Sequence, residues 1–213
     1  MKKVFKYCLS VLTLLLAMSW AVAQPSGAKP LTDAEKTTLL SALSNSFQSV
    51  QCDFRQEKKS ALFNESSVSE GVMYFKKPSS LRWEYKSPVA SVIMMNGNDV
   101  KVIDATGKEQ SKGGQMYRQL ASLIAGVVSG KELENGKNFK SEFYGNATCY
   151  WIKLTPTNRR LKAFFSHIEM TVDKQKRVAV KMLLSEKEGD STTITFSNHK
   201  VNTAIDSKLF NTK

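Results

Sequence analysis

Residues 71–85 read GVMYFKKPSSLRWEY, and this stretch decides the fold. Its second half alternates the apolar side chains of Leu81, Trp83 and Tyr85 with polar ones, the period of two that is typical of a strand with one buried face. Its first half is rich in the β-branched and aromatic residues that strands favour. Between the halves lies Lys77-Pro78, and Pro ends a ladder where its missing N–H does no harm. The stretch therefore predicts two strands that meet at a corner.

The same period of two continues along most of the chain. Asn96-Gly97 separates two apolar runs, residues 92–95 and 100–104, which is the strongest short-range hairpin signal. Further strands are expected over residues 50–56, 68–75, 139–144, 148–155, 164–172, 178–186 and 192–201, with turns at 145–146, 173–174 and 189–190. About ten short strands with hairpin-length connections predict a mainly β (α+β) fold with one strongly curved or barrel-like antiparallel sheet.

Two helices are expected beside this sheet. Thr32 and Glu35 have the spacing of a capping box, in which each side chain satisfies a backbone N–H of the other residue. Leu39, Leu43 and Phe47 then recur at four-residue intervals, which predicts an amphipathic helix over about 33–48. Apolar residues recur at helical spacing again between Gly113 and Gly130, and they predict a second helix over 116–128.

Residues 1–23 have the pattern of a cleavable secretory signal. Three lysines precede an apolar stretch, and Ala21-Val22-Ala23 has the small-residue pattern of a cleavage site. An uncleaved N-terminal anchor is the alternative. We expect export to the periplasm, a flexible lead over 24–31 and a single domain over 32–213.

The chain is basic, with 31 Lys and Arg against 19 Asp and Glu and a net charge of +12. A basic surface suits nucleic acid, anionic headgroups or an acidic partner. An exported protein meets little nucleic acid, and the lysines are scattered, so we expect no nucleic-acid partner. Two interpretations of the charge stay open: solvated strand faces, or a surface biased toward membranes.

Two of the three cysteines, Cys52 and Cys149, lie beyond the signal segment. In an oxidising compartment they can form a disulfide, provided that their Cα atoms come within bridging distance. Two free thiols are the alternative, and the sequence leaves both possibilities open.

No pattern for catalysis or for a metal site is found. The two histidines, His167 and His199, each lie in an expected strand without a companion at ligand spacing. The sequence has no nucleophile elbow, phosphate-binding glycine loop or zinc-protease helix. We therefore expect a protein that is not an enzyme and that needs no cofactor or metal.

Several of these segments, taken in order, resemble the LolA family of periplasmic lipoprotein carriers. Residues 71–85 are similar to the family's aromatic strand, basic corner before Pro and apolar-x-Trp strand, with Pro88 following. Residues 50–56 are similar to the family's first strand, residues 92–104 to its next hairpin, and residues 206–210 to its closing motif. The resemblance implies an incomplete, strongly curved antiparallel β-barrel with a helical lid.

The resemblance also implies a function and a set of partners. The expected activity is to hold the acyl chains of lipoproteins that an inner-membrane ABC-type release complex delivers, and to carry them toward an outer-membrane acceptor where one exists. We expect the carrier to act as a monomer. The alternative is an envelope sensor or interaction module that has the same half-barrel and carries nothing.

For the site, the resemblance places Leu81, Trp83 and Tyr85 on the inner side of the barrel. We add as further candidates for the acyl cavity Met73, Phe75, Met94, Met116, Leu120, Leu123 and Ile124. An ordinary closed core is the alternative interpretation of the same side chains. The family usually has Arg where this chain has Lys77, so we expect Lys77 to be a weaker latch on the 116–128 helix; a solvated corner is the alternative.

Overall fold

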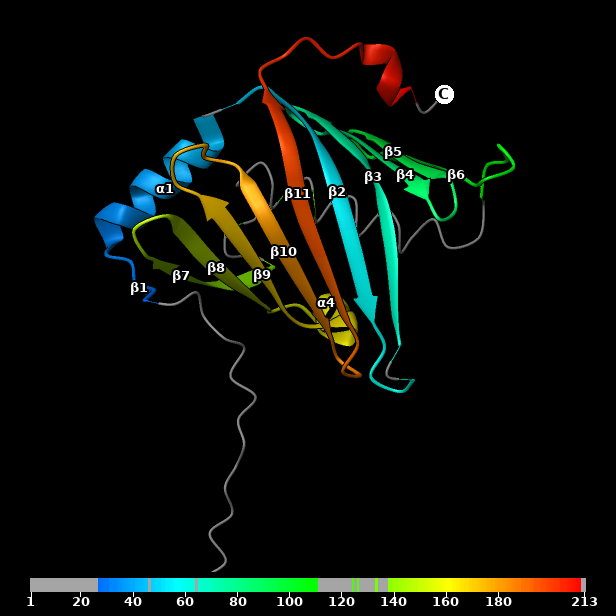
Figure 1. The fold of residues 1–213 in the computed structure, drawn as a ribbon. Coiled ribbons are helices and arrows are strands. Elements are labelled where there is room, and N and C mark those ends of the chain that lie inside the picture. Colours follow the sequence, from blue (N-terminus) through cyan, green and yellow to red (C-terminus); the bar gives the residue numbers. More distant parts are fainter. Residues whose placement is uncertain are drawn as a thin grey trace, which may run out of the picture.

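A single antiparallel sheet of 11 strands dominates the computed structural model, which describes residues 27–45, 47–63, 65–110, 124, 126, 133 and 138–211 (Figure 1). The strands are β1 (Lys29–Pro30), β2 (Ser49–Lys59), β3 (Ser66–Lys76), β4 (Ser80–Ser87), β5 (Ser91–Asn96), β6 (Asp99–Ile103), β7 (Phe139–Gly145), β8 (Cys149–Pro156), β9 (Phe165–Asp173), β10 (Ala179–Glu186) and β11 (Ser191–Val201). Their order across the sheet is β1-β7-β8-β9-β10-β11-β2-β3-β4-β5-β6.

The stretch over residues 71–85 forms the predicted pair of strands. β3 and β4 are antiparallel, and Met73 lies opposite Trp83 while Phe75 lies opposite Leu81. The Lys77–Pro78 peptide bond at the corner is cis. Because side chains alternate between the faces of a strand, this register places the apolar residues of both strands on one face.

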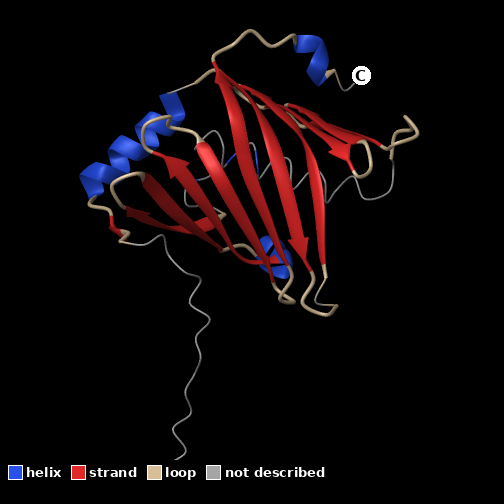
Figure 2. Cartoon of the chain, in the orientation of Figure 1, coloured by secondary structure: helices blue, strands red, loops and turns tan. Residues whose placement is uncertain are grey.

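The sheet is strongly curved and remains open, as the sequence predicts for an incomplete barrel (Figure 2). β1 and β6 are its two edge strands, and they do not pair with each other in the part of the chain that the structure describes. The chain passes from β6 at one edge to β7, the neighbour of the other edge strand, through residues 104–138. The expected helix over 116–128 belongs to this connection and lies outside the described residues, apart from positions 124 and 126.

Helix α1 (Asp33–Asn45) begins at the predicted capping box. The Thr32 N–H donates to Glu35 Oε2 (2.8 Å), and the Glu35 N–H donates to Thr32 Oγ1 (3.3 Å). The helix ends at Asn45, three residues before the predicted end, and Phe47 follows it in an irregular segment. Leu39 and Leu43 are its buried residues, so α1 packs one apolar stripe onto the ends of the strands (Figure 1).

Three short elements are absent from the sequence-based prediction. Strand β1 pairs with β7 inside the expected flexible lead over 24–31, so that expectation is wrong for Lys29–Pro30. Helix α4 (Arg159–Phe164) precedes β9 and is capped by Asn158, whose side chain accepts from the Leu161 N–H. The 3₁₀ helix η1 (Ser207–Phe210) follows β11, and Phe210 on it is buried. Phe164, which the sequence places in a strand, is therefore the last residue of α4.

Among the described residues, no helix is both long enough and apolar enough to cross a membrane. The predicted signal over 1–23 and the first residues of the lead, 24–26, lie outside the described residues.

Candidate functional site

One face of the sheet, here called the inner face, carries a continuous apolar surface. Its side chains form a single buried cluster with Leu39 and Leu43 of α1 and with Ile124 and Leu133 of the connection between β6 and β7. Apolar side chains from both edges of the open sheet thus share one interior.

Around β2–β5 the inner face is arranged in three rows that run across the strands. The first joins Phe196, Phe54, Gly71 and Tyr85; the second joins Cys52, Met73, Trp83, Ile93 and Val102; the third joins Val50, Phe75, Leu81, Met95 and Val100. Register partners on one face of a sheet lie within side-chain contact of each other. Each row is therefore a strip of contacting apolar groups.

An aromatic cluster lies at the centre of these rows. The indole of Trp83 stacks on the ring of Phe54, with ring centroids 4.2 Å apart, and Phe196 meets the same indole edge-on at 6.1 Å. Gly71 makes room for the stack, since a Cβ there would lie 2.6 Å from Phe54 Cζ. The Tyr85 hydroxyl donates to Gln56 Oε1 at 3.0 Å, which satisfies the polar end of that ring.

Trp83 differs from Tyr85 in one respect. Its side chain is 2% exposed, and its indole N–H has no hydrogen-bond partner among the residues that the structure describes. A buried donor without a partner is uncommon, because losing its hydrogen bond to water costs about 1–3 kcal/mol. The centre of the apolar face thus offers one free hydrogen-bond donor.

A small apolar cavity of about 20 Å³ lies beside this cluster. Its lining consists of Phe47, Val50, Cys52, Met73, Val178, Ala179, Phe196 and His199. Its volume is far below the range of about 300–1,000 Å³ that ligand pockets span, and is little more than one water molecule needs. Most of the inner face is thus covered by the protein's own side chains.

Lys77 closes one end of the inner face. Its ammonium donates to the Ser44 carbonyl in the last turn of α1 and lies 5.0 Å from the ring centroid of Phe47. Phe47 in turn meets Phe75 edge-on, with centroids 6.2 Å apart. Lys77 therefore joins the corner between β3 and β4 to the C-terminal end of α1. The predicted contact with the 116–128 helix lies outside the described residues.

Lys76 has a different surrounding, because it points to the opposite face. Its ammonium donates to Ser207 Oγ of η1 at 3.0 Å. The two adjacent lysines thus contact two different elements. Lys77 contacts α1 on the inner side of the sheet, and Lys76 contacts η1 on the outer side.

The predicted cavity residues separate into three groups. Leu81, Trp83, Met73 and Phe75 are buried on the inner face, Tyr85 packs against them, and Ile124 belongs to the same cluster. Met116, Leu120 and Leu123 lie outside the described residues.

Met94 is a wrong prediction. It lies opposite Arg82, whose guanidinium donates to the Met94 sulfur at 3.4 Å, and it is not part of the inner cluster. The neighbouring Met95, opposite Leu81, occupies the inner face instead. Both residues of the Met94-Met95 pair are apolar, so the alternation that assigns faces is ambiguous there.

Phe54, Phe196 and Ile93 also belong to the inner face and were not predicted. The signal was present, because each alternates with polar or opposite-facing residues within its strand.

Cys52 and Cys149 are free thiols, so the structure contains no disulfide between them. Three strands, β9, β10 and β11, separate their strands in the sheet, which amounts to about 19 Å along the sheet at ~4.8 Å per strand. That is far beyond bridging distance. Burial raises the pKa of the Cys52 thiol to about 12.

Neither histidine belongs to the aromatic cluster, although His199 lines the small cavity beside it. His167 Nε2 is 3.1 Å from Glu169 Oε1, and the other carboxylate oxygen of Glu169 accepts from the Trp151 indole N–H at 3.2 Å. His199 Nε2 is 3.0 Å from the Ala179 carbonyl, and burial lowers its pKa. Among the described residues, no three His, Cys, Asp or Glu side chains converge as metal ligands.

Comparison with known proteins fits this geometry. Residues 45–213 match the family described as Outer membrane lipoprotein carrier protein LolA. The chain belongs to the LolA family. An outer-membrane lipoprotein carrier protein of Methylococcus capsulatus is 28% identical over 93% of this chain and 90% of that protein. A second LolA-family relative, the outer-membrane lipoprotein carrier protein of Chromobacterium violaceum, is 26% identical over 90% of this chain and 89% of that protein.

A solved structure of a much less similar protein shares the fold. The complex structure of Pseudomonas aeruginosa MucA/MucB matches 84% of this chain and 60% of that chain, with a TM-score of 0.51 and 10% sequence identity. At this identity the likeness shows the fold alone. The open, curved sheet of the LolA family is thus also found in a protein of a different name and assembly.

Proposed function

We propose that this protein is a carrier that holds the acyl chains of lipoproteins against the inner face of its sheet and moves them from the inner toward the outer membrane. The observation that carries the proposal is the single apolar interior, which extends across β2–β5 and is closed at one end by α1 and Lys77. Its relatives are named as outer-membrane lipoprotein carriers, which supports the same activity.

The proposed activity requires binding and release but no covalent chemistry. Each buried CH₂ contributes about 0.8 kcal/mol, so one fully sequestered acyl chain contributes on the order of 10 kcal/mol. A carrier that gained all of this could scarcely release its cargo. In this chain the acyl groups compete with the protein's own side chains for the inner face, since the empty interior is already closed, and this competition lowers the net affinity.

The cellular setting is part of the proposal. Residues 1–23 would direct export to the periplasm and be removed, and the domain that follows, which begins with β1, would act as a monomer. The inner-membrane partner would be an ABC-type lipoprotein release complex, and an outer-membrane acceptor would receive the cargo.

The first experiment is mass spectrometry of protein purified from its native periplasm. We expect acylated polypeptide or lipid to copurify, and delipidation to open a site for a fluorescent fatty acid. Protein that is empty and ignores such probes would favour the alternative, a sensor or interaction module with the same fold.

Two adjacent methionines provide a matched pair of variants for this test. Met95→Gln places an amide on the inner face, whereas Met94→Gln places the same amide on the outer face. Both side chains are about equally buried, at 3% and 5% exposed, so the effect on folding is comparable. Only Met95→Gln should weaken binding of the fluorescent fatty acid, and equal effects of both variants would argue against the inner face as the site.

A further inference from the structure

Three strongly exposed apolar side chains lie at one end of the sheet. Leu62 and Phe63, adjacent in the turn between β2 and β3, are 82% and 72% exposed. Phe164 at the end of α4 is 44% exposed. The strand directions place the β2–β3 turn and α4 at the end opposite α1, here called the turn end (Figure 1).

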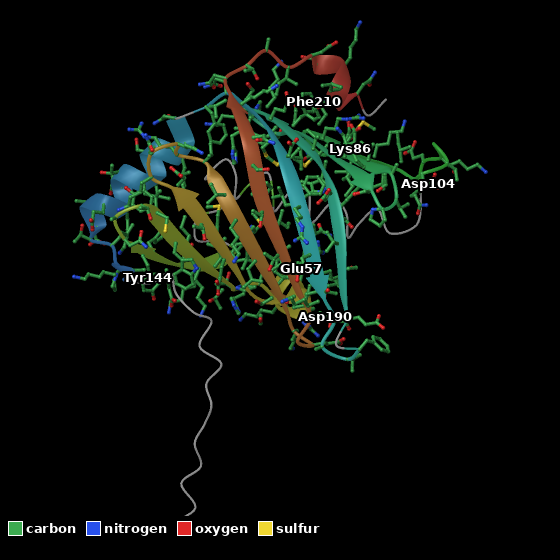
Figure 3. All side chains as sticks on the ribbon, in the orientation of Figure 1. Glu57, Lys86, Asp104, Tyr144, Asp190 and Phe210 are labelled. Carbon is green, nitrogen blue, oxygen red and sulfur yellow. The ribbon has the colours of Figure 1, made fainter. Side chains whose placement is uncertain are left out.

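Hydrogen bonds between neighbouring connections give the turn end a defined shape. The Ala61 N–H donates to the Asp190 carboxylate (2.9 Å), which ties the β2–β3 turn to the β10–β11 turn. The Lys187 N–H donates to the Phe164 carbonyl (3.0 Å), which ties the β10–β11 turn to α4. Figure 3 shows Asp190 at this end, below Glu57 on β2. Leu62 and Phe63 therefore project from a supported turn.

Exposed basic groups lie on the neighbouring elements of the turn end. Arg159, Arg160 and Lys162 are exposed on α4, and Lys187 is exposed in the β10–β11 turn. The acidic groups nearby are partly neutralised, because the Lys58 ammonium lies 3.7 Å from Glu186 and 3.9 Å from Asp190. The remaining exposed acids of the two turns are Glu65 and Glu188, so unpaired positive charge exceeds negative charge at the turn end.

We propose that the turn end docks on an anionic phospholipid bilayer, with Leu62 and Phe63 entering the layer between headgroups and acyl chains. Apolar side chains that project from turns, rather than line a groove, suit a soft surface better than a shaped protein pocket. Basic residues beside them attract anionic headgroups, each such contact adding affinity that falls with salt. The net charge, +12 for the whole chain and +9 after the proposed removal of residues 1–23 with their three lysines (12 − 3), acts in the same direction. This proposal goes beyond the carriage of acyl chains and does not depend on it.

Flotation with lipid vesicles tests the proposal. The probes are vesicles of phosphatidylethanolamine and phosphatidylglycerol in a 3:1 ratio of roughly bacterial charge density, compared with pure phosphatidylcholine vesicles. We expect the parent to float with the anionic vesicles only. The double variant Leu62→Ser/Phe63→Ser should lose at least roughly tenfold in affinity, because two exposed apolar side chains no longer leave water.

Matched controls come from the other end of the sheet. Val201, 36% exposed at the end of β11, provides Val201→Ser, which should float like the parent. Neutralising α4 with Arg159→Gln, Arg160→Gln and Lys162→Gln should weaken anionic binding by roughly tenfold or more, whereas the same change at Lys29, Lys200 and Lys208 should have a smaller effect. All variants carry the same N-terminus, so any contribution of residues 1–26 cancels.

Entry of the β2–β3 turn into the bilayer is measured separately, by quenching of tryptophan fluorescence. Phe63→Trp should be quenched by lipids brominated on their acyl chains, and Val201→Trp should not. A parent that ignores anionic vesicles, or a Leu62→Ser/Phe63→Ser variant that floats like the parent, would overturn the proposal. Binding of a fluorescent fatty acid without vesicles should be the same in all turn-end variants, so loss of the carrier activity and loss of docking are distinguished.

Discussion

At the scale of single residues, Trp83 has the property most useful for recognising cargo. Its N–H lies in an apolar interior, next to side chains that line the cavity, and has no acceptor among the described residues. An acyl chain attached through an ester or amide brings a carbonyl oxygen, whereas a plain hydrocarbon does not. A cargo carbonyl that accepts from Trp83 would recover the hydrogen bond that burial removes.

We expect Trp83→Phe to discriminate between two ligands of the same chain length. Affinity for methyl palmitate should fall about tenfold more than affinity for hexadecane, because only the ester loses a hydrogen-bond donor. Replacing Trp83 by benzothienylalanine, which keeps the shape and lacks the N–H, should give the same difference. Equal losses for both ligands would show that Trp83 contributes apolar surface only.

The two cysteines differ in their surroundings, and their reactivity should differ accordingly. With a pKa of about 12, only about one Cys52 thiol in ten thousand is ionised at pH 8, and the thiolate is the reactive form. Cys149 is partly exposed. We expect iodoacetamide to alkylate Cys149 in the folded protein and both cysteines in urea, as measured by peptide mass spectrometry. Rapid labelling of Cys52 in the folded state, or a disulfide in the exported protein, would contradict the structure.

At the scale of elements, the regular patterns were predictable and the ambiguous ones were not. The capping box at Thr32 and Glu35 and the strand alternation over Leu81–Tyr85 each follow from one local rule, and the structure confirms both. Met94 and Met95 are both apolar, so only the register with β4 decides which one faces inward. Helix α4 has one turn and a half with no buried residue, so it lacks the apolar periodicity that identifies a helix.

The latch at Lys77 also belongs to this scale, because it joins two elements. The resemblance to the LolA family indicated the residue and a partner in the 116–128 helix, whereas the observed contact with the last turn of α1 depends on tertiary packing. A cation at a helix C-terminus interacts favourably with the partial negative charge of the last carbonyls. The contact between Lys77 and the last turn of α1 exists in the empty, closed state. It must break if α1 is to move away and open the inner face at that end.

We therefore expect Lys77→Leu to change ligand binding more than stability. Without the latch the closed state is less favoured, so affinity for the fluorescent fatty acid should rise about tenfold and its transfer to acceptor vesicles should slow. Lys77→Arg should do the reverse, since a guanidinium bridges two acceptors more firmly. Lys76→Leu, which removes the contact with η1 on the outer face, is the matched control and should bind like the parent. If all three variants bind and release alike, the latch is not at Lys77.

At the scale of the whole molecule, the inner face and the segments that pack on it form one apolar cluster. Hairpin signals and alternation along the chain predicted one strongly curved antiparallel sheet, and the resemblance to the LolA family implied that it stays open. The sequence could not predict how far the interior closes, since this depends on how Leu39, Leu43, Ile124 and Leu133 pack against strands that are distant in sequence. The resulting cavity of about 20 Å³ is far too small for acyl cargo.

Cargo can therefore bind only if the sheet opens or if a segment that covers the inner face moves away. Opening the sheet of 11 strands costs more free energy than moving α1. Opening the sheet breaks rows of backbone hydrogen bonds, whereas moving α1 exposes the stripe of Leu39 and Leu43 and releases Lys77. The acyl chain offsets that exposure by covering the inner face in place of α1. The element expected to move is thus α1.

Amide hydrogen exchange measured with and without a bound fatty acid checks this expectation. Residues 33–45 should exchange faster in the loaded protein, while β2, β3, β4 and β11 should keep or gain protection because their hydrogen bonds persist under the ligand. Met95→Gln, which should bind the ligand poorly, should show little change at the same ligand concentration. Uniform protection that includes α1 would mean that cargo enters without displacing this helix, and the competition between cover and cargo would then have to lie in the connection between β6 and β7.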